Sequence, residues 1–281
     1  MSIDCKRSHA VFQRLESDLV KLSAKPSRDR VHRFRTGARR LEILLSGIAP
    51  GLDRNQKKLL KLIDRIRKRA GKVRDLDVQL AALRSLKVPR EPRRKTQLVH
   101  HLIDARARQE KKLQKSLDRA SVREVRKRLK RAARQFDPEV CRDPLTVATT
   151  FVNTFYHSDA PISQALLHQY RILSKRARYA AELSQFSPAS ARLIGEIRRL
   201  QDALGDWHDW FILTAAARQN LGGVPESPLV AELHNLTGAK YRHAVALLSR
   251  ARQTRAASQP QISVAPADHA GASQARANSA A

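Results

Sequence analysis

A histidine and several arginines recur at helical spacing in "VHRFRTGARRLEILL", residues 31–45. Apolar residues there recur at three- and four-residue steps, which predicts a helix whose buried face holds Val31, Phe34, Ala38, Leu41, Leu45 and Ile48. His32, Arg35 and Arg39 lie in one narrow arc beside that face. Arg33 and Arg40 are expected to point toward solvent. Because a row of like charges repels itself unless an anion lies along it, the spacing predicts an anion-binding row.

The chemistry of such a row suits a chain of phosphates. An arginine guanidinium donates two charge-assisted hydrogen bonds to one phosphate, and arginines one helical turn apart can meet successive phosphates. A lysine in the same row acts as a point charge. Inorganic polyphosphate carries about one negative charge per unit and no base edges, so it needs nothing else from the protein.

The row is repeated later in the chain. The stretch "HRFRTGARR", from His32, matches "HQYRILSKR", from His168. The matched pairs are His32 with His168, Arg35 with Arg171, Arg39 with Lys175, and Arg40 with Arg176. On the second predicted helix a narrow arc beside an apolar face again gathers basic residues, namely His168, Arg171, Lys175 and Arg178. The anion-binding row is therefore expected twice.

A second pair of similar stretches lies downstream of each row. The segment "IRKRAGKVRDLDV", from Ile66, resembles "LQDALGDWHDWFI", from Leu200. The alignment pairs Gly71 with Gly205, Arg74 with His208, and Asp75 with Asp209. Two pairs at nearly constant offset indicate two related helical halves, about 7–137 and about 144–250, that meet near residues 137–144.

Composition points to the same class of partner. The 281 residues hold 55 Lys and Arg against 26 Asp and Glu, so the net charge of +29 favours a polyanion: nucleic acid, polyphosphate or an anionic membrane. Cys5 and Cys141 show no metal-type spacing, which is typical of a reducing compartment. The amino-terminal residues lack an apolar targeting segment and no run is long enough to span a membrane. We therefore expect a cytoplasmic protein without a membrane partner.

Helix-forming residues dominate up to about residue 255, which predicts an all-α protein of eight to ten helices. Residues 256–281 are rich in Ala, Ser, Gln and Pro and lack apolar periodicity, so they are expected to form a disordered tail. Residues 1–255 are then one domain made of the two halves. Its charge is uneven, because the first 140 residues carry +24 and the rest +5.

These motifs resemble the CHAD family, the conserved histidine α-helical domain, over roughly residues 7–250. The resemblance rests on "HRFRTGARRLE" and "GKVRDLDV" in the first half, then "HQYRILSKRARYAAEL" and "LQDALGDWHD" in the second. It implies two pseudo-symmetric four-helix bundles with a basic cleft between them that binds inorganic polyphosphate. The family is often fused to a triphosphate tunnel domain that starts with an alternating "ExExK" motif, which this chain lacks, so a stand-alone module is expected.

The resemblance carries the binding role to individual positions. The expected polyphosphate-binding residues are His32, Arg35, Arg39, Arg40, Arg65, Arg69, Lys72, Arg74, His168, Arg171, Lys175, Arg176, Arg178 and His208. One departure is that Ala203 and Asp206 stand where the first half has Arg69 and Lys72. The corresponding helix of the second half is therefore not expected to contribute equally.

The histidines have two interpretations. Neighbouring cations lower the pKa of a histidine, whereas bound phosphate favours its protonated form, so His32 and His168 are expected to donate only when a ligand is present. The alternative is a structural histidine hydrogen-bonded at a bundle interface. Repetition of the motif favours the binding role.

No catalytic residue, metal ligand or cofactor is expected. The sequence has no P-loop, HExxH, CxxC, GxSxG or dinucleotide motif. Asp75 and Asp209 have no visible catalytic partner and are expected to orient a neighbouring basic residue. Adjacent His100 and His101 fall on different helix faces, so they are not expected to share a metal.

Two other functions stay open. A nucleic-acid-binding helical protein needs little beyond positive charge. Against it, aromatic residues make up only 5% of the chain and none lies in the first cationic arc, so a base-stacking surface is missing there. A scaffold that attaches to acidic proteins or to polyphosphate granules is compatible with polyphosphate binding. The amphipathic stretch around residues 122–136 has a basic face that is either simply solvated or an extension of the polyanion track.

Overall fold

The computed structural model describes residues 3–87, 91–156, 161–223 and 227–258, and the side chains up to residue 254. Within these ranges the chain is all-α, as predicted, and its one β-bridge joins Ile3 to Ser184. The helices are α1 (Cys5–Ala24), α2 (Arg28–Ile43), α3 (Arg54–Ser85), α4 (Pro92–Lys115), α5 (Arg119–Arg134), α6 (Pro144–Tyr156), α7 (Gln164–Ala181), α8 (Pro188–Leu221) and α9 (Pro228–Ser258). A short π-helical turn, η1 (Leu44–Ile48), ends α2.

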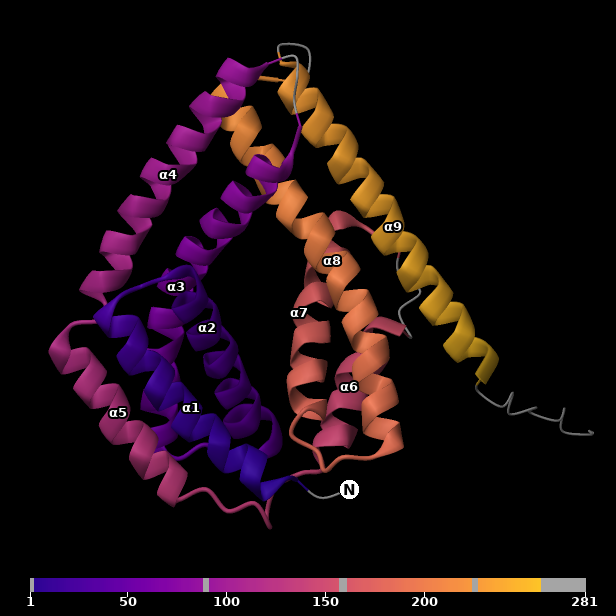
Figure 1. Cartoon of the computed structure of the whole chain (residues 1–281). Coiled ribbons are helices and arrows are strands. Elements are labelled where there is room, and N and C mark those ends of the chain that lie inside the picture. The colour runs from indigo at the N-terminus through magenta and orange to yellow at the C-terminus, as the bar shows by residue number, and fades with distance from the viewer. Residues whose placement is uncertain (1–2, 88–90, 157–160, 224–226, 259–281) are drawn as a thin grey trace, which may run out of the picture.

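The first half builds a bundle from α1, α2, α3 and α5. Side-chain caps start its helices, because Asp4, Ser27, Asp53 and Asp118 each accept a hydrogen bond from a backbone N–H three residues later. Gly37 lets α1 approach α2 closely, since a Cβ there would lie 3.3 Å from Leu15 Cδ1. Helix α4 leaves the bundle and packs along the far end of α3 (Figure 1).

The second half builds its bundle from α6, α7, α8 and α9. Ser163 caps α7, and Ser187 caps α8 just before a proline in the first turn. Gly222 ends α8 with a φ of 89°, a conformation that favours glycine. The chain then returns through α9, which runs antiparallel beside α8 (Figure 1).

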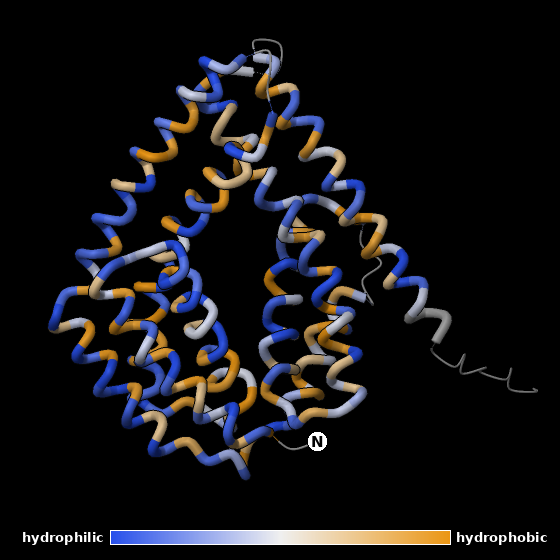
Figure 2. Tube along the Cα trace, in the orientation of Figure 1, coloured by the Kyte–Doolittle hydropathy of each residue, from blue (hydrophilic) through white to orange (hydrophobic). Residues whose placement is uncertain are grey.

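Two apolar cores hold the halves together. The larger core runs through both bundles and across the packing of α2 against α7. A second core lies at the apex in Figure 1, where the α3–α4 pair meets the α8–α9 pair. It is built mainly from Leu80, Leu83, Leu98, Leu102, Leu213, Leu229, Val230 and Leu233. Hydrophilic and hydrophobic positions alternate in short runs along the helices, the pattern of amphipathic helices (Figure 2).

The structure bears on the expected tail and on the expected lack of a membrane-spanning helix. Helix α9 continues to Ser258, three residues beyond the expected boundary at residue 255, and Ala256 and Ala257 are good helix formers. The remainder of the expected tail, 259–281, lies outside the described residues. No helix in the described ranges is both long and apolar enough to span a membrane.

Candidate functional site

Packing of α2 against α7 brings the two predicted rows together. We call Arg35 and Arg39 of α2, with Arg171 and Lys175 of α7, the central cation cluster. Burial, followed by the positive charges of Arg171, Arg39 and Arg35, lowers the pKa of Lys175 to about 7. The two halves therefore hold four cationic side chains within electrostatic reach of one another.

The apolar face of each helix fixes the direction of its row. On α2 the buried residues include Val31, Phe34, Ala38 and Leu41, the face predicted from the sequence. On α7 they include Leu167, Tyr170, Ser174 and Ala177. Because the cations flank these faces, burying the faces against the cores leaves the cations at the junction of the halves.

Each row meets one carboxylate from the neighbouring helix. Arg35 Nη1 lies 3.6 Å from Asp75 Oδ1 of α3, and Arg171 Nη2 lies 3.9 Å from Asp209 Oδ1 of α8. The arginine side chains are 21% and 14% exposed, whereas Asp75 is 55% exposed. Asp75 and Asp209 therefore contact half-buried arginines of a neighbouring helix from the solvent side.

The negative charges of Asp75 and Asp209 do not balance the positive charges of the four half-buried cations. Burial is the largest cause that lowers the pKa of Arg35, Arg39 and Arg171, and neighbouring cations lower each further. Arg171 Nε is buried and has no hydrogen-bond partner. The central cation cluster is thus short of negative charge and of acceptors, which an anion would supply.

The histidines flank the central cation cluster from opposite halves. Burial lowers the pKa of His32, and Arg74 and Arg35 lower it further. Burial and Arg171 lower the pKa of His168, whose ring centroid lies 5.1 Å from that of His208. Burial lowers the pKa of His208 to about 3, and its buried Nδ1 has no partner. The three rings are therefore mostly neutral at pH 7 without a ligand.

Three other predicted residues form ion pairs. Arg40 was expected to point toward solvent, but this expectation was wrong, because Nη2 donates to Glu182 Oε2 of the other half at 2.8 Å. Arg176 Nη2 lies 3.9 Å from Glu42 Oε1 in the opposite direction, and Arg178 Nε lies 3.6 Å from Glu182 Oε1. The Arg40 and Arg176 pairs therefore link α2 to α7, whereas the Arg178–Glu182 pair lies at the end of α7 itself.

The partners Glu42 and Glu182 were not singled out from the sequence. Each follows a basic run, in "ARRLE" and "RARYAAE". Which carboxylate a basic residue meets across two halves depends on how α2 and α7 pack, and helical spacing within one segment does not contain that information.

The predicted residues of α3 divide into two groups. Arg74 acts on the pKa values of His32, Arg35 and Asp209, so it belongs beside the central cation cluster. Arg65, Arg69 and Lys72 are exposed, and none has an ion pair within 4.0 Å in the described part of the chain. Among the described residues, none of these three forms a hydrogen bond or ion pair with the central cation cluster.

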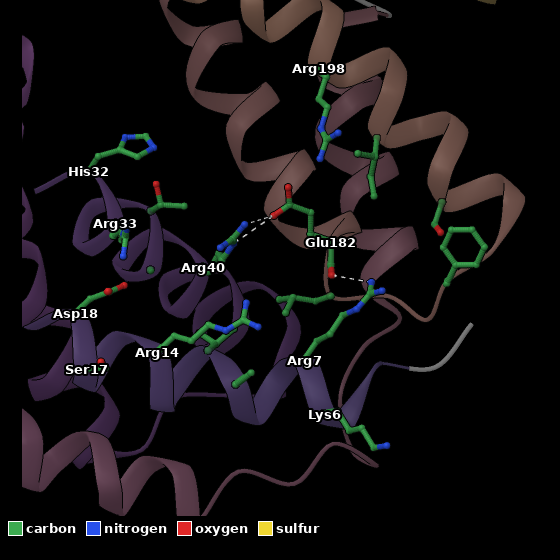
Figure 3. A pocket seen from close by; sticks show the side chains of 18 of the residues that line it. Lys6, Arg7, Arg14, Ser17, Asp18, His32, Arg33, Arg40, Glu182 and Arg198 are labelled. Atoms are coloured by element: carbon green, nitrogen blue, oxygen red, sulfur yellow. Dashed lines mark hydrogen bonds and ion pairs between the residues drawn. The ribbon is translucent and has the colours of Figure 1, made fainter. Parts of the chain in front are cut away.

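A basic pocket does lie between the halves, but the rows contribute little to it. It has a volume of about 1140 Å³ and is lined by α1, α2, the α7–α8 connection and the start of α8 (Figure 3). Of the predicted residues, only His32 and Arg40 line it. Sequence reasoning missed Arg14 and Arg198, because these two residues lie outside the repeated motifs.

The histidines, cysteines and carboxylates of the described residues do not gather into a metal site. No group of three or more His, Cys, Asp or Glu could hold a metal ion within those residues. His100 and His101 are exposed, and Cys5 and Cys141 are free. Trp207 is buried in the larger core.

Comparison with protein-family models identifies the family of this chain. The CHAD domain model matches residues 9–218. The chain belongs to the CHAD family. The solved structure of the CHAD domain from the plant Ricinus communis is similar to this CHAD domain, with 18% identity, coverage of 84% of this chain and 83% of that one, and a TM-score of 0.55.

A second solved structure supports the same CHAD fold. PptA from Streptomyces chartreusis is 16% identical, with coverage of 90% of this chain and 99% of that chain, and a TM-score of 0.59. A search of curated proteins returned no match. At these identities the two solved structures establish the fold, and the site must be argued from this chain's own residues.

Proposed function

We propose that this CHAD domain binds inorganic polyphosphate at the central cation cluster without catalysing a reaction on it. The observation that carries the proposal is that Arg35, Arg39, Arg171 and Lys175 lie half-buried at the packing of α2 against α7, with their pKa values lowered. A polyanion relieves this mutual repulsion and supplies the missing acceptors. Membership of the CHAD family agrees with this ligand, because the repeated motifs resemble those that imply polyphosphate binding.

The spacing of the cluster fits a linear ligand. Arg35 and Arg39 are one turn apart on α2, as are Arg171 and Lys175 on α7. Each arginine can donate two hydrogen bonds to one phosphate, while the amine of Lys175 contributes a point charge. His32, His168 and His208 become additional donors when the bound phosphate raises their pKa values.

The ligand contacts both halves at once. Because α2 and α7 come from different halves, a bound chain links them in addition to their apolar core. Binding that requires both halves stabilises the folded state by linkage. We therefore expect the melting temperature to rise with polyphosphate concentration.

Competition at fixed salt tests the proposal. The purified protein is titrated with long-chain polyphosphate in the presence of labelled duplex DNA. Duplex DNA has a persistence length of about 150 base pairs and cannot bend into a recessed cluster, whereas polyphosphate can. We expect polyphosphate to displace DNA at far lower charge concentration than unlabelled DNA does. Equal displacement would leave only general electrostatic attraction.

Nucleic-acid binding has one structural observation in its favour. Exposed cations follow the outer face of α5 at three- and four-residue spacing and make no ion pair within 4.0 Å in the described part of the chain: Arg119, Arg123, Lys127, Arg131 and Arg134. A straight exposed row suits a stiff duplex. If neutralising Arg123 and Lys127 abolishes DNA binding and polyphosphate binding alike, the outer face is the polyanion site and the proposal fails.

The proposed role is that of a binding or granule-targeting module. Chain-length analysis of polyphosphate after incubation with the protein tests the absence of catalysis, since hydrolysis or transfer would shorten the chains. Fluorescence imaging of the tagged protein beside stained polyphosphate granules tests the targeting role. Unchanged chains and co-localisation are the expected results.

A further inference from the structure

The basic pocket between the halves has a composition different from that of the central cation cluster. Seven Lys and Arg line it against two carboxylates, Asp18 and Glu182. None of the four cluster residues lines it. Its walls also include Val11, Leu183, Phe186 and Ile194. The pocket therefore combines excess positive charge with apolar surface.

Contacts within the protein occupy part of that charge. Arg40 donates to the Glu182 carboxylate, and Arg7 Nη1 donates to the carbonyl oxygen of Glu182 at 3.3 Å (Figure 3). Arg7 Nη1 also donates to the carbonyl oxygen of Ser184 at 3.2 Å. The Glu182 carboxylate is therefore already paired within the protein. Five pocket cations make no ion pair within 4.0 Å in the described part of the chain: Lys6, Arg14, Lys21, Arg33 and Arg198.

The other carboxylate cannot balance these five cations. Asp18 is half-buried, and burial raises its pKa even though Lys21, Arg33 and Arg14 lower it. Arg14 and Arg198 reach into the pocket from α1 and α8, on opposite sides of the Arg40–Glu182 pair (Figure 3). Phosphate groups placed between them would be reached from two helices of different halves.

Besides its excess positive charge, the pocket has an exposed aromatic side chain, Phe186. It is 77% exposed, the largest value among the exposed large hydrophobic residues in the described part of the chain. Unlike Val20, Ile103, Val140 and Ile172, which do not line the pocket, Phe186 lies in its wall with Leu183 and Ile194. An aromatic ring left open beside a cationic surface is suited to stacking against a planar group that carries negative charge.

We infer that this pocket binds a nucleoside polyphosphate, with the phosphates among Arg14, Arg33 and Arg198 and the base against Phe186. The volume of about 1140 Å³ exceeds that of most small-molecule sites, roughly 300–1,000 Å³, so a nucleotide fits with ordered water. Inorganic polyphosphate has no group for Phe186, so this site is distinct in chemistry from the central cation cluster. The inference does not depend on the proposed polyphosphate function.

Titration with magnesium-free ATP and with inorganic triphosphate tests the inference. For the wild-type protein we expect ATP to bind at least fivefold more tightly than triphosphate, since stacking of a base on an aromatic ring stabilises a complex by about 1–3 kcal/mol. Phe186→Ala is expected to remove that difference and to leave triphosphate binding unchanged. Val140→Ala is the matched control, because Val140 is 57% exposed and lies outside the pocket.

A second variant addresses the phosphates. Arg14→Gln combined with Arg198→Gln is expected to weaken ATP and triphosphate binding equally, by tenfold or more, while the fold is unchanged because both side chains are exposed. Arg35→Gln combined with Arg39→Gln is expected to spare ATP binding, which separates this site from the polyphosphate proposal. If Phe186→Ala leaves the preference for ATP intact, or if wild type shows no preference, the inference is overturned.

Discussion

Arg35 Nη1 of α2 lies 3.6 Å from Asp75 Oδ1 of α3, and Arg171 repeats this geometry with Asp209 in the second half at 3.9 Å. The carboxylates hold two arginines of the central cation cluster in place. They also lie close to the positions where a phosphate would accept hydrogen bonds from these arginines. Each acid therefore both orients its arginine and competes with an anionic ligand.

Removing one of these charges separates the two effects. Asp75→Asn keeps the shape and deletes the negative charge, so polyphosphate affinity is expected to rise several-fold at low salt. Isothermal titration measures it. Asp64→Asn, which removes an acid paired with Arg67 and Lys68 elsewhere on α3, is the control and should have less effect. A fall in affinity with Asp75→Asn would mean that orienting Arg35 is the dominant effect.

Neutralising two cluster arginines should reduce binding far more than neutralising two exposed lysines. Arg35→Gln with Arg39→Gln removes charge-assisted hydrogen bonds of about 1.5–3 kcal/mol each, so polyphosphate affinity is expected to fall a hundredfold or more. Lys57→Gln with Lys61→Gln removes the same charge from exposed positions on α3. Titrations at two salt concentrations, with circular dichroism as the folding control, measure both. Equal losses of affinity in the two double variants would mean that the cluster contributes only through the overall positive charge of the protein.

Polyphosphate binding should take up a proton at Lys175. Its pKa is lowered from 10.5 to about 7 in the free protein, first by burial and then by Arg171, Arg39 and Arg35, while Asp209 opposes the shift. A bound anion raises that pKa, so affinity is expected to fall as the pH rises above 7, where the free amine is neutral. Lys175→Arg stays charged and should show a flatter pH profile. Titration in buffers of different ionisation enthalpy counts the protons, and Lys61→Arg is the control.

Glu182 should be a stability residue. Its carboxylate accepts two hydrogen bonds from Arg40, at 2.8 and 3.2 Å, and lies 3.6 Å from Arg178 Nε. Glu182→Gln leaves these half-buried guanidinium groups without their charge partner, so the free energy of unfolding is expected to fall by about 1–3 kcal/mol. Denaturant unfolding measures the loss. Asp206→Asn removes the pair with Lys240, whose side chain is 37% exposed while that of Asp206 is 60% exposed, and should cost about 0.2–1 kcal/mol. Equal losses would mean that the pair across the halves is no stronger than a surface pair.

The apex core should be as sensitive as a core within one bundle. Leu102→Ala empties a position that is 1% exposed between α4 and the other apex helices, and the free energy of unfolding is expected to fall by about 2–5 kcal/mol. The next residue supplies the control, because Ile103 is 38% exposed. Thermal and denaturant unfolding are suitable measurements. A loss no larger than that of Ile103→Ala would show that the apex is loosely packed.

The sequence predicted the rows because helical periodicity is a local property. Val31, Phe34 and Ala38 define the buried face of α2, and that face fixes where Arg35 and Arg39 must lie. The repeat then predicted that the halves share a fold. Local spacing could not predict that Arg40 reaches Glu182, because the partner depends on how α2 meets α7.

The pocket was beyond prediction for a related reason. Arg14 and Arg198 lie outside the repeated motifs, and only packing places them on opposite sides of the Arg40–Glu182 pair. Similarly, the exposure of Phe186 is a property of the α7–α8 connection in three dimensions and has no signature in hydrophobic periodicity.

The β-bridge from Ile3 to Ser184 joins the start of the chain to a residue well into its second half. Asp4 N donates to the carbonyl oxygen of Leu183 at 2.9 Å, and Arg7 donates to Ser184 nearby. During synthesis on the ribosome, the first helical bundle emerges long before these partners do. The amino terminus can therefore form the bridge only after residue 184 has left the ribosome. A chain whose synthesis stops before that residue lacks the lining residues that α8 contributes to the basic pocket.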